Sequence, residues 1–131
     1  MRVYWDSSAL VVATMDPKVR QRLLEPDQFT RSHTLAEVFS TLTGGRLGFR
    51  VDATDAAAVV SQLGDSLQFV ELEVQEIVSA LNSARDLGVR GGRVHDFLHA
   101  VAASKAECQV LKTLNTADFQ GLFASGELKA I

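Results

Sequence analysis

Four acidic side chains lie at positions where the sequence could bring them to one point. Asp6 ends an apolar run, Val3-Tyr4-Trp5, that is typical of a buried strand, and Asp118 follows a second such run after a short linker. Glu37 and Asp96 each lie in or near the first turn of a predicted helix. Because strand carboxyl ends and helix amino ends share one edge of a parallel α/β sheet, we expect the four carboxylates to meet there.

Crowded carboxylates raise one another's pKa unless a cation compensates their charge. A hard divalent cation removes that penalty and prefers oxygen ligands, so we expect Mg²⁺ or Mn²⁺. Zinc fits less well, because the sequence offers no pair of His or Cys residues at ligand spacing. A metal held by these acids would polarise a phosphoryl oxygen and activate a water, which is the chemistry of phosphodiester hydrolysis. The pattern leaves open whether one ion or two bind, and whether Glu37 acts through a bound water.

The elements that must position the acids alternate along the chain. Apolar runs predict strands at residues 2–5, 29–32, 67–72, 109–114 and 128–131. Helices are expected after Ser7 and Ser8, which could cap the first one, and at residues 34–47, 54–63, 73–87 and 94–107. Residues 23–27 are expected to form a second short helix or a turn. Strands that alternate with helices indicate a parallel sheet covered on both faces. The fold class is therefore α/β, a three-layer α/β/α sandwich with a central parallel sheet.

Composition limits the remaining possibilities. A length of 131 residues predicts one domain over residues 1–131, and the 47% hydrophobic content excludes a disordered chain. The net charge of −3 argues against a strongly basic DNA-coating protein but permits a nuclease. Cys108 is the only cysteine and cannot form an internal disulfide, which suits a reducing compartment. No targeting segment or membrane-spanning run is visible, so we expect a cytoplasmic protein without membrane contact.

Four stretches surround the acids in sequence order, and together they span nearly the whole chain. They are Val3-Tyr4-Trp5-Asp6-Ser7-Ser8-Ala9-Leu10, Thr34-Leu35-Ala36-Glu37-Val38, Val94-His95-Asp96-Phe97-Leu98-His99-Ala100 and Thr113-Leu114-Asn115-Thr116-Ala117-Asp118-Phe119. In this order and at this chain length they resemble the PIN-domain ribonucleases, especially the VapC-like toxins of bacterial toxin–antitoxin pairs.

The resemblance implies a PIN-like α/β/α fold and a metal-dependent endoribonuclease that hydrolyses RNA. The acidic quartet holding Mg²⁺ or Mn²⁺ would be Asp6, Glu37, Asp96 and Asp118. Polar support near the metal would come from Ser7 or Ser8 and from Thr113, and Asn115 would brace the loop that carries Asp118. Family members commonly form homodimers and are neutralised by a small antitoxin protein, so both partners are expected here.

One departure from the family pattern concerns the turn after Asp96, where some members carry a further acid and this chain has His99. Its imidazole could contact an RNA phosphate or a metal-bound water, and the alternative is a partly exposed helix residue. Arg93, in the Gly-rich joint before the same helix, is the second candidate for contact with RNA phosphates. His33 and His95 have no partner at metal spacing and receive no role.

Two other functions compete with the nuclease. The first is a catalytically inactive PIN-like binding module, against which the presence of all four acids argues. The second is a phosphoacceptor receiver domain on a similar α/β sheet. A receiver needs paired acids after its first strand, and here Ser7 follows Asp6; the strand at residues 67–72 is followed by Glu73, a poor phosphoacceptor.

Overall fold

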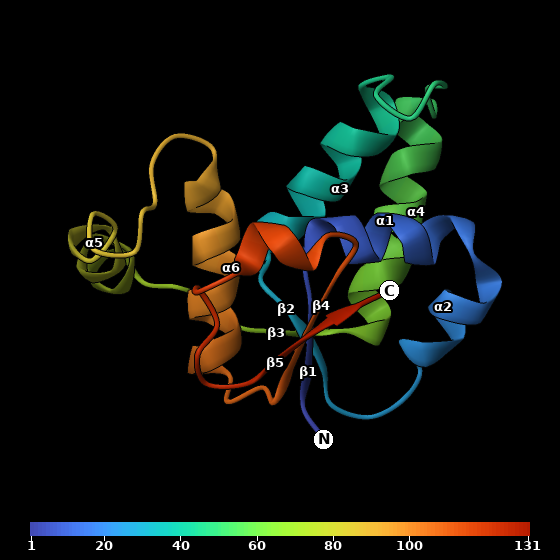
Figure 1. Cartoon of the computed structure of the whole chain (residues 1–131). Helices are drawn as coiled ribbons and strands as arrows, with labels where there is room; N and C mark the ends of the chain where they lie inside the picture. Colours follow the sequence, from blue (N-terminus) through green and yellow to red (C-terminus); the bar gives the residue numbers. More distant parts are fainter.

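The computed structural model describes all 131 residues and places helices on both faces of one five-stranded sheet (Figure 1). The elements in chain order are β1 (Val3–Trp5), α1 (Ser7–Met15), α2 (Pro17–Arg22), β2 (Gln28–Thr30), α3 (His33–Thr43), α4 (Ala53–Ser66), β3 (Gln68–Phe69), α5 (Val74–Asn82), α6 (Arg93–Lys105), β4 (Val110–Thr113), the 3₁₀ helix η1 (Thr116–Phe119) and β5 (Glu127–Ala130). This order confirms the predicted alternation of strands and helices.

The sheet is parallel throughout, with the strand order β3-β2-β1-β4-β5. Tyr4 on the central strand pairs with Phe29 on one side and with Leu111 on the other. The chain builds outward from β1 through β2 to β3, and then returns to add β4 beside β1. The strand order therefore reverses between β1 and β4, and open α/β sheets bind ligands beyond the strand ends at such a switch point.

Alternating residues of the strands supply two hydrophobic cores, one on each face of the sheet. Val3 and Trp5 pack with the helices α1 to α4, whereas Tyr4 and Leu111 pack against α6 and the segment that follows β4. Figure 1 shows these two helical layers on opposite sides of the sheet. The predicted α/β/α sandwich is thus confirmed, and Trp5, fully buried with its Nε1 donating to Gln28 Oε1 at 2.7 Å, is a core residue as expected.

Several predicted boundaries were wrong for local reasons. Asp6, and not Ser7 or Ser8, is the N-cap of α1, because its carboxylate accepts from the backbone of the first turn. A second helix begins at Pro17, whose fixed φ suits a first helical position, whereas residues 23–27 form turns and bends, the alternative expected there. α3 ends at Thr43, since Gly45 takes a φ of +85° that a continued helix does not allow.

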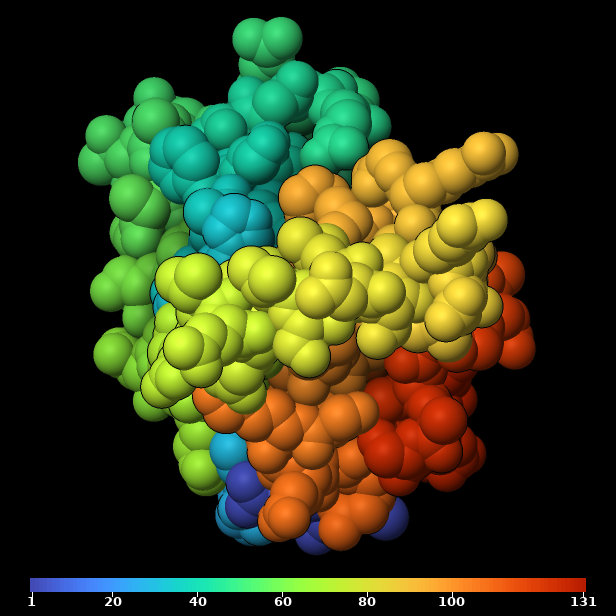
Figure 2. All heavy atoms as spheres, turned by 90° about the vertical axis from the view of Figure 1, so that its left-hand side faces the viewer, coloured from blue at the N-terminus to red at the C-terminus, as the bar shows by residue number.

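The edge carrying β3 and α5 is less buried than the sequence suggested. Phe69, within the strand expected at residues 67–72, is 38% exposed, because β3 is a two-residue edge strand. α5 has no buried residue and lies across the outside of α6, as the yellow-green segment in Figure 2 shows. Lys105 on α6 holds it there through a 2.5 Å ion pair with Glu76. No helix combines the length and the apolar character needed to cross a bilayer.

Candidate active site

Asp6 is the buried acid at the end of the central strand. Its backbone N–H donates to the carbonyl oxygen of Lys112 on β4 at 3.1 Å, so it stands at the switch point of the sheet. Its Oδ1 accepts from Ser8 Oγ at 2.7 Å and from the backbone N–H of Ala9 at 2.8 Å. Asp6 is 4% exposed, and burial raises the pKa of its carboxyl although these hydrogen bonds oppose the rise.

Ser8 and Thr113 form the polar contacts around Asp6. Their hydroxyl oxygens lie 3.3 Å apart, and Ser8 Oγ also accepts from the backbone N–H of Leu114 at 2.9 Å. This bond links the start of α1 to the end of β4. Ser7, the other candidate for support, points instead into a neighbouring polar cleft. Ser8 is therefore the serine that holds Asp6 in place.

Asp118 lies on η1, just beyond the carboxyl end of β4, and its side chain is exposed. Asn115 braces this segment, because its Oδ1 accepts from the backbone N–H of Ala117 at 3.1 Å. Arg93, the first residue of α6, donates from Nη2 to the carbonyl oxygen of Gln120 at 2.8 Å. Arg93 thus ties α6 to the segment after Asp118, and its contact with RNA stays a prediction.

Asp96 lies in the first turn of α6, and its pKa shows how the charges of the other acids affect it. Its pKa is raised from 3.8 to about 6. Burial is the largest cause, and the negative charge of Asp118 is the next. Asp6 and Glu37 push the pKa of Asp96 in the same direction, whereas His99 opposes them. The structure therefore brings all four predicted acids close enough to act on one another through their charges.

Glu37 reaches this edge from the start of the second turn of α3, near the first turn as the sequence suggested. Its Oε1 lies 2.9 Å from Nε2 of His99, which is ion-pair distance, although neither atom has a hydrogen-bond partner of good geometry. The other ring nitrogen of His99, Nδ1, lies 2.8 Å from the Tyr4 hydroxyl. Burial is the largest single influence on the pKa of Glu37 and raises it, but the contact with His99 and the charges of His99, His33 and His95 together outweigh burial, so the pKa is lowered.

The hydrogen-bonding capacity of Tyr4, His99 and Glu37 limits which atom can donate in the contact of His99 with each neighbour. A carboxylate only accepts, so Nε2 of His99 carries the hydrogen that faces Glu37. Burial raises the pKa of Tyr4, so its hydroxyl stays protonated and can donate to Nδ1 of His99. His99 is 1% exposed, and the prediction that it contacts RNA was wrong because its ring is enclosed between Tyr4 and Glu37. Sequence reasoning missed this pairing with Tyr4.

The four acids do not converge closely enough to chelate an ion together. No group of three His, Cys, Asp or Glu side chains meets at ligand distance anywhere in the chain. The donor set still suits Mg²⁺ or Mn²⁺, since every donor is a carboxylate oxygen and Asp96 carries the repulsion that a cation would relieve. Mg²⁺ keeps several waters and takes only one or two carboxylates directly, so full convergence is not required.

His33 and His95 were given no role from the sequence, yet both lie beside Glu37. Each lowers the pKa of Glu37 through its charge. Both line a polar cleft of about 460 Å³ next to the acids, together with Arg46. A signal was present in the sequence: His33 lies four residues before Glu37 on one helix face, and His95 directly precedes an acid.

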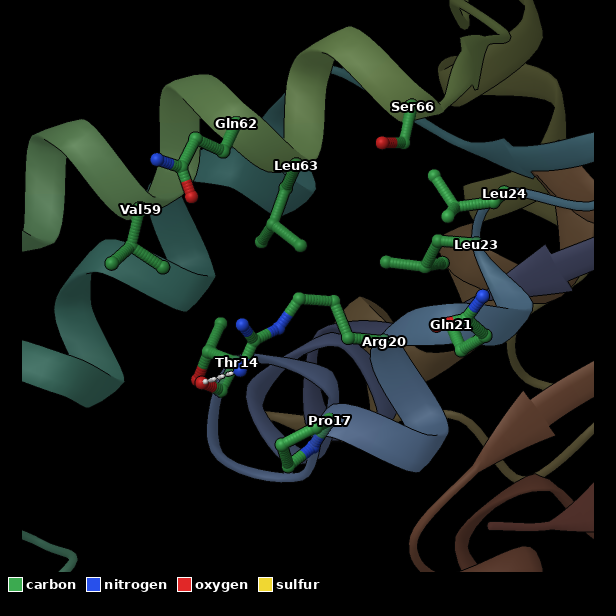
Figure 3. Close-up of a pocket in the computed structure, with 10 residues that line it drawn as sticks. All are labelled: Thr14, Pro17, Arg20, Gln21, Leu23, Leu24, Val59, Gln62, Leu63 and Ser66. Atoms are coloured by element: carbon green, nitrogen blue, oxygen red, sulfur yellow. Dashed lines mark hydrogen bonds between the residues drawn. The ribbon is translucent and has the colours of Figure 1, made fainter.

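A separate cavity of about 370 Å³ lies on the other side of the molecule, between α1, α2 and α4 (Figure 3). Leu23, Leu63 and Val59 give it an apolar wall. Arg20 donates from Nη2 to the carbonyl oxygen of Thr14 at 3.0 Å and so closes the end of α1. No acidic residue lines this cavity, so it offers no carboxylate chemistry.

No protein-family model matches the sequence, and no curated protein matches it. Several solved structures are similar in fold, among them the following two. PAE2754 from Pyrobaculum aerophilum has a TM-score of 0.69 at 17% identity, over 98% of this chain and 89% of its own. VapBC-1 from nontypeable Haemophilus influenzae has a TM-score of 0.67 at 18% identity, over 99% of this chain and 98% of its own. The chain thus shares the fold of these two structures, in agreement with the fold that the motifs around the acids led us to expect.

Proposed function

We propose that this protein is a metal-dependent endoribonuclease that acts as the toxin of a toxin–antitoxin pair. The similarity in fold to VapBC-1 supports the class of protein. The observation that carries the proposal is the electrostatic state of Asp96, whose pKa rises to about 6 under the influence of burial, Asp118, Asp6 and Glu37. Structural ion pairs lower the pKa of their carboxyls, whereas a carboxyl whose pKa is raised by neighbouring acids at a sheet edge is what a cation site needs.

Mg²⁺ or Mn²⁺ bound at this edge would polarise a phosphoryl oxygen and lower the pKa of a water molecule beside it. The residues around the acids would fix the orientation of the carboxylates. Ser8 and Ala9 donate hydrogen bonds to Asp6, His99 contacts Glu37, and Asn115 stabilises the segment that carries Asp118. One of the four carboxylates would accept the proton that the attacking water releases.

Cleavage of total RNA by the purified protein tests this proposal. We expect cleavage with Mg²⁺ or Mn²⁺, none after addition of EDTA, and a loss of about 100-fold or more in Asp96→Asn. Asp86→Asn is the matched control, because Asp86 is exposed in the turns after α5, away from the acids. Full cleavage by a folded Asp96→Asn variant, or cleavage that persists in EDTA, would show that these carboxylates do not carry the reaction.

A catalytically inactive PIN-like binding module is the second candidate. It is favoured by the absence of three converging ligands and by the contact that already engages Glu37. The same assay separates the two, since a binding module would retain RNA without divalent-dependent cleavage. A receiver domain gains no support, because β3 is an edge strand and no Asp follows it before α5.

We further propose an antitoxin as the protein partner, on the basis of the likeness to VapBC-1, and a homodimer as the assembled state. Co-expression with the product of a small neighbouring gene should suppress cleavage if that product is the antitoxin. Light scattering on the purified chain should give twice the 14.2 kDa monomer mass. A monomeric mass at every concentration would contradict the homodimer.

A further inference from the structure

The polar cleft beside the acids is built from three separate parts of the chain. Ser7 comes from the start of α1, His95 from the first turn of α6, and Arg46 from the loop after α3. α3 itself contributes His33 and Thr41, which lie on the same helix face as Glu37. The starts of α1, α3 and α6 lie at the upper edge of the sheet in Figure 1. We call this surface the donor cleft.

The donor cleft offers hydrogen-bond donors with almost no competing acceptors. Its one acidic lining residue is Glu37, whose Oε1 is already in contact with His99. Arg46 forms no salt bridge, and its one side-chain bond is a 3.3 Å contact from Nη2 to Thr41 Oγ1. His33 and His95 are both exposed, so their ring nitrogens are accessible. The cleft is therefore prepared for a ligand rich in acceptor oxygens.

The chemistry and size of the donor cleft narrow the choice of ligand. A transition metal held by His33, Glu37 and His95 is not supported, since these three side chains do not converge at ligand distance. An anion fits, because a guanidinium and imidazole N–H groups are the donors that proteins use for phosphate. The volume of about 460 Å³ lies within the range of sites for a small ligand such as one nucleotide.

We propose that the donor cleft binds the phosphodiester next to the scissile one in single-stranded RNA, with Arg46, His33 and His95 as its donors. This inference rests on the nuclease function proposed above and adds the path of the substrate. The scissile phosphate lies at the acids, and the next phosphate of the same strand lies against Arg46. The strand then passes along the face of α3 that His33 and Thr41 share.

Fluorescence anisotropy with a labelled 2′-O-methyl oligouridine tests the donor cleft without any cleavage. With the full chain in excess EDTA, we expect the dissociation constant to rise several-fold in Arg46→Ala and in His33→Ala. The slope of log affinity against log salt should fall by about 0.7 in Arg46→Ala, the value for one phosphate contact on a single strand. Arg50→Ala is the matched control, since Arg50 is an exposed arginine of the same loop that does not line the cleft.

Two results would overturn the inference. One is unchanged binding in both Arg46→Ala and His33→Ala, and the other is an equal loss in Arg50→Ala, which would indicate diffuse charge attraction. Because binding is measured without metal, this outcome is independent of whether the chain cleaves RNA. In a cleavage assay Arg46→Ala should raise KM with little change in kcat, whereas failure of the nuclease proposal would appear as absent cleavage in the parent chain.

Discussion

Replacing Asp96 with Asn should stabilise the metal-free protein while it weakens the site. The pKa of Asp96 is raised to about 6, first by burial and then by the charge of Asp118, with Asp6 and Glu37 adding to the repulsion. An ionised Asp96 therefore costs the folded state free energy at neutral pH. An amide of nearly the same shape carries no charge and removes that cost, so the variant should unfold at higher denaturant concentration.

The magnitude follows from the difference between 3.8 and about 6 for the pKa of Asp96. At about 1.4 kcal/mol for each pKa unit, a fully buried group would lose about 3 kcal/mol. Asp96 is half-buried and solvent screens its neighbours, so we expect about 1 kcal/mol. Between pH 3.8 and about 6 the unfolded chain releases its proton while the folded chain retains it. Stability must therefore fall as pH rises through this window.

Urea denaturation in EDTA, repeated across this window, measures the effect. The parent protein should be less stable at the upper end of this pH window than at the lower end. Asp96→Asn should lose about 1 kcal/mol less stability over the same window, and it should be the more stable protein at neutral pH. A residual slope is expected, since burial also raises the pKa of Asp6. An Asp96→Asn variant that is less stable than the parent at neutral pH, or that keeps the full slope, would refute the reasoning.

Three further predictions concern the framework of the site. Tyr4→Phe and His99→Ala should each lower the free energy of unfolding by about 1–3 kcal/mol in urea denaturation. The double variant should lose less than the sum of the two, because the two groups share one hydrogen bond. Strictly additive losses would contradict this hydrogen bond. Gly126→Ala should cost about 1–3 kcal/mol, as its Cβ would meet a carbonyl oxygen at 2.6 Å, whereas Gly64→Ala, with open space inside α4, should be neutral or stabilising. Cys108 is buried, and burial raises the pKa of its thiol to about 11, so a thiol reagent should modify it at the rate of unfolding and not on mixing.

Local sequence patterns were sufficient to predict the order of the elements and the edge at which the acids gather. Asp6 directly after an apolar strand and Asp96 in a helical first turn are positions that follow from periodicity and parallel topology alone. The order β3-β2-β1-β4-β5 was not predictable, because strand pairing depends on contacts between distant segments. That order places Asp6 and Asp118 beyond the two strands that flank the switch point.

The environment of His99 was the main feature that sequence could not supply. Its position one turn after Asp96 suggested a phosphate contact, since both residues belong to the same helix. Whether a helix residue faces solvent or the sheet depends on how the helix is rotated against β1, and here that rotation buries His99 against Tyr4. The role of His33 and His95 depends likewise on the approach of α3 to α6.

Titration with Mn²⁺, followed by the loss of the free-ion signal in electron paramagnetic resonance, tests most directly whether the four acids form a divalent metal site. We predict saturable binding to the parent chain at millimolar or lower concentration, at least about tenfold weaker binding to Asp96→Asn, which corresponds to about 1.4 kcal/mol, and no change in Asp86→Asn. Absence of saturable binding at millimolar Mn²⁺, or equal binding by the parent and Asp96→Asn, would contradict the account.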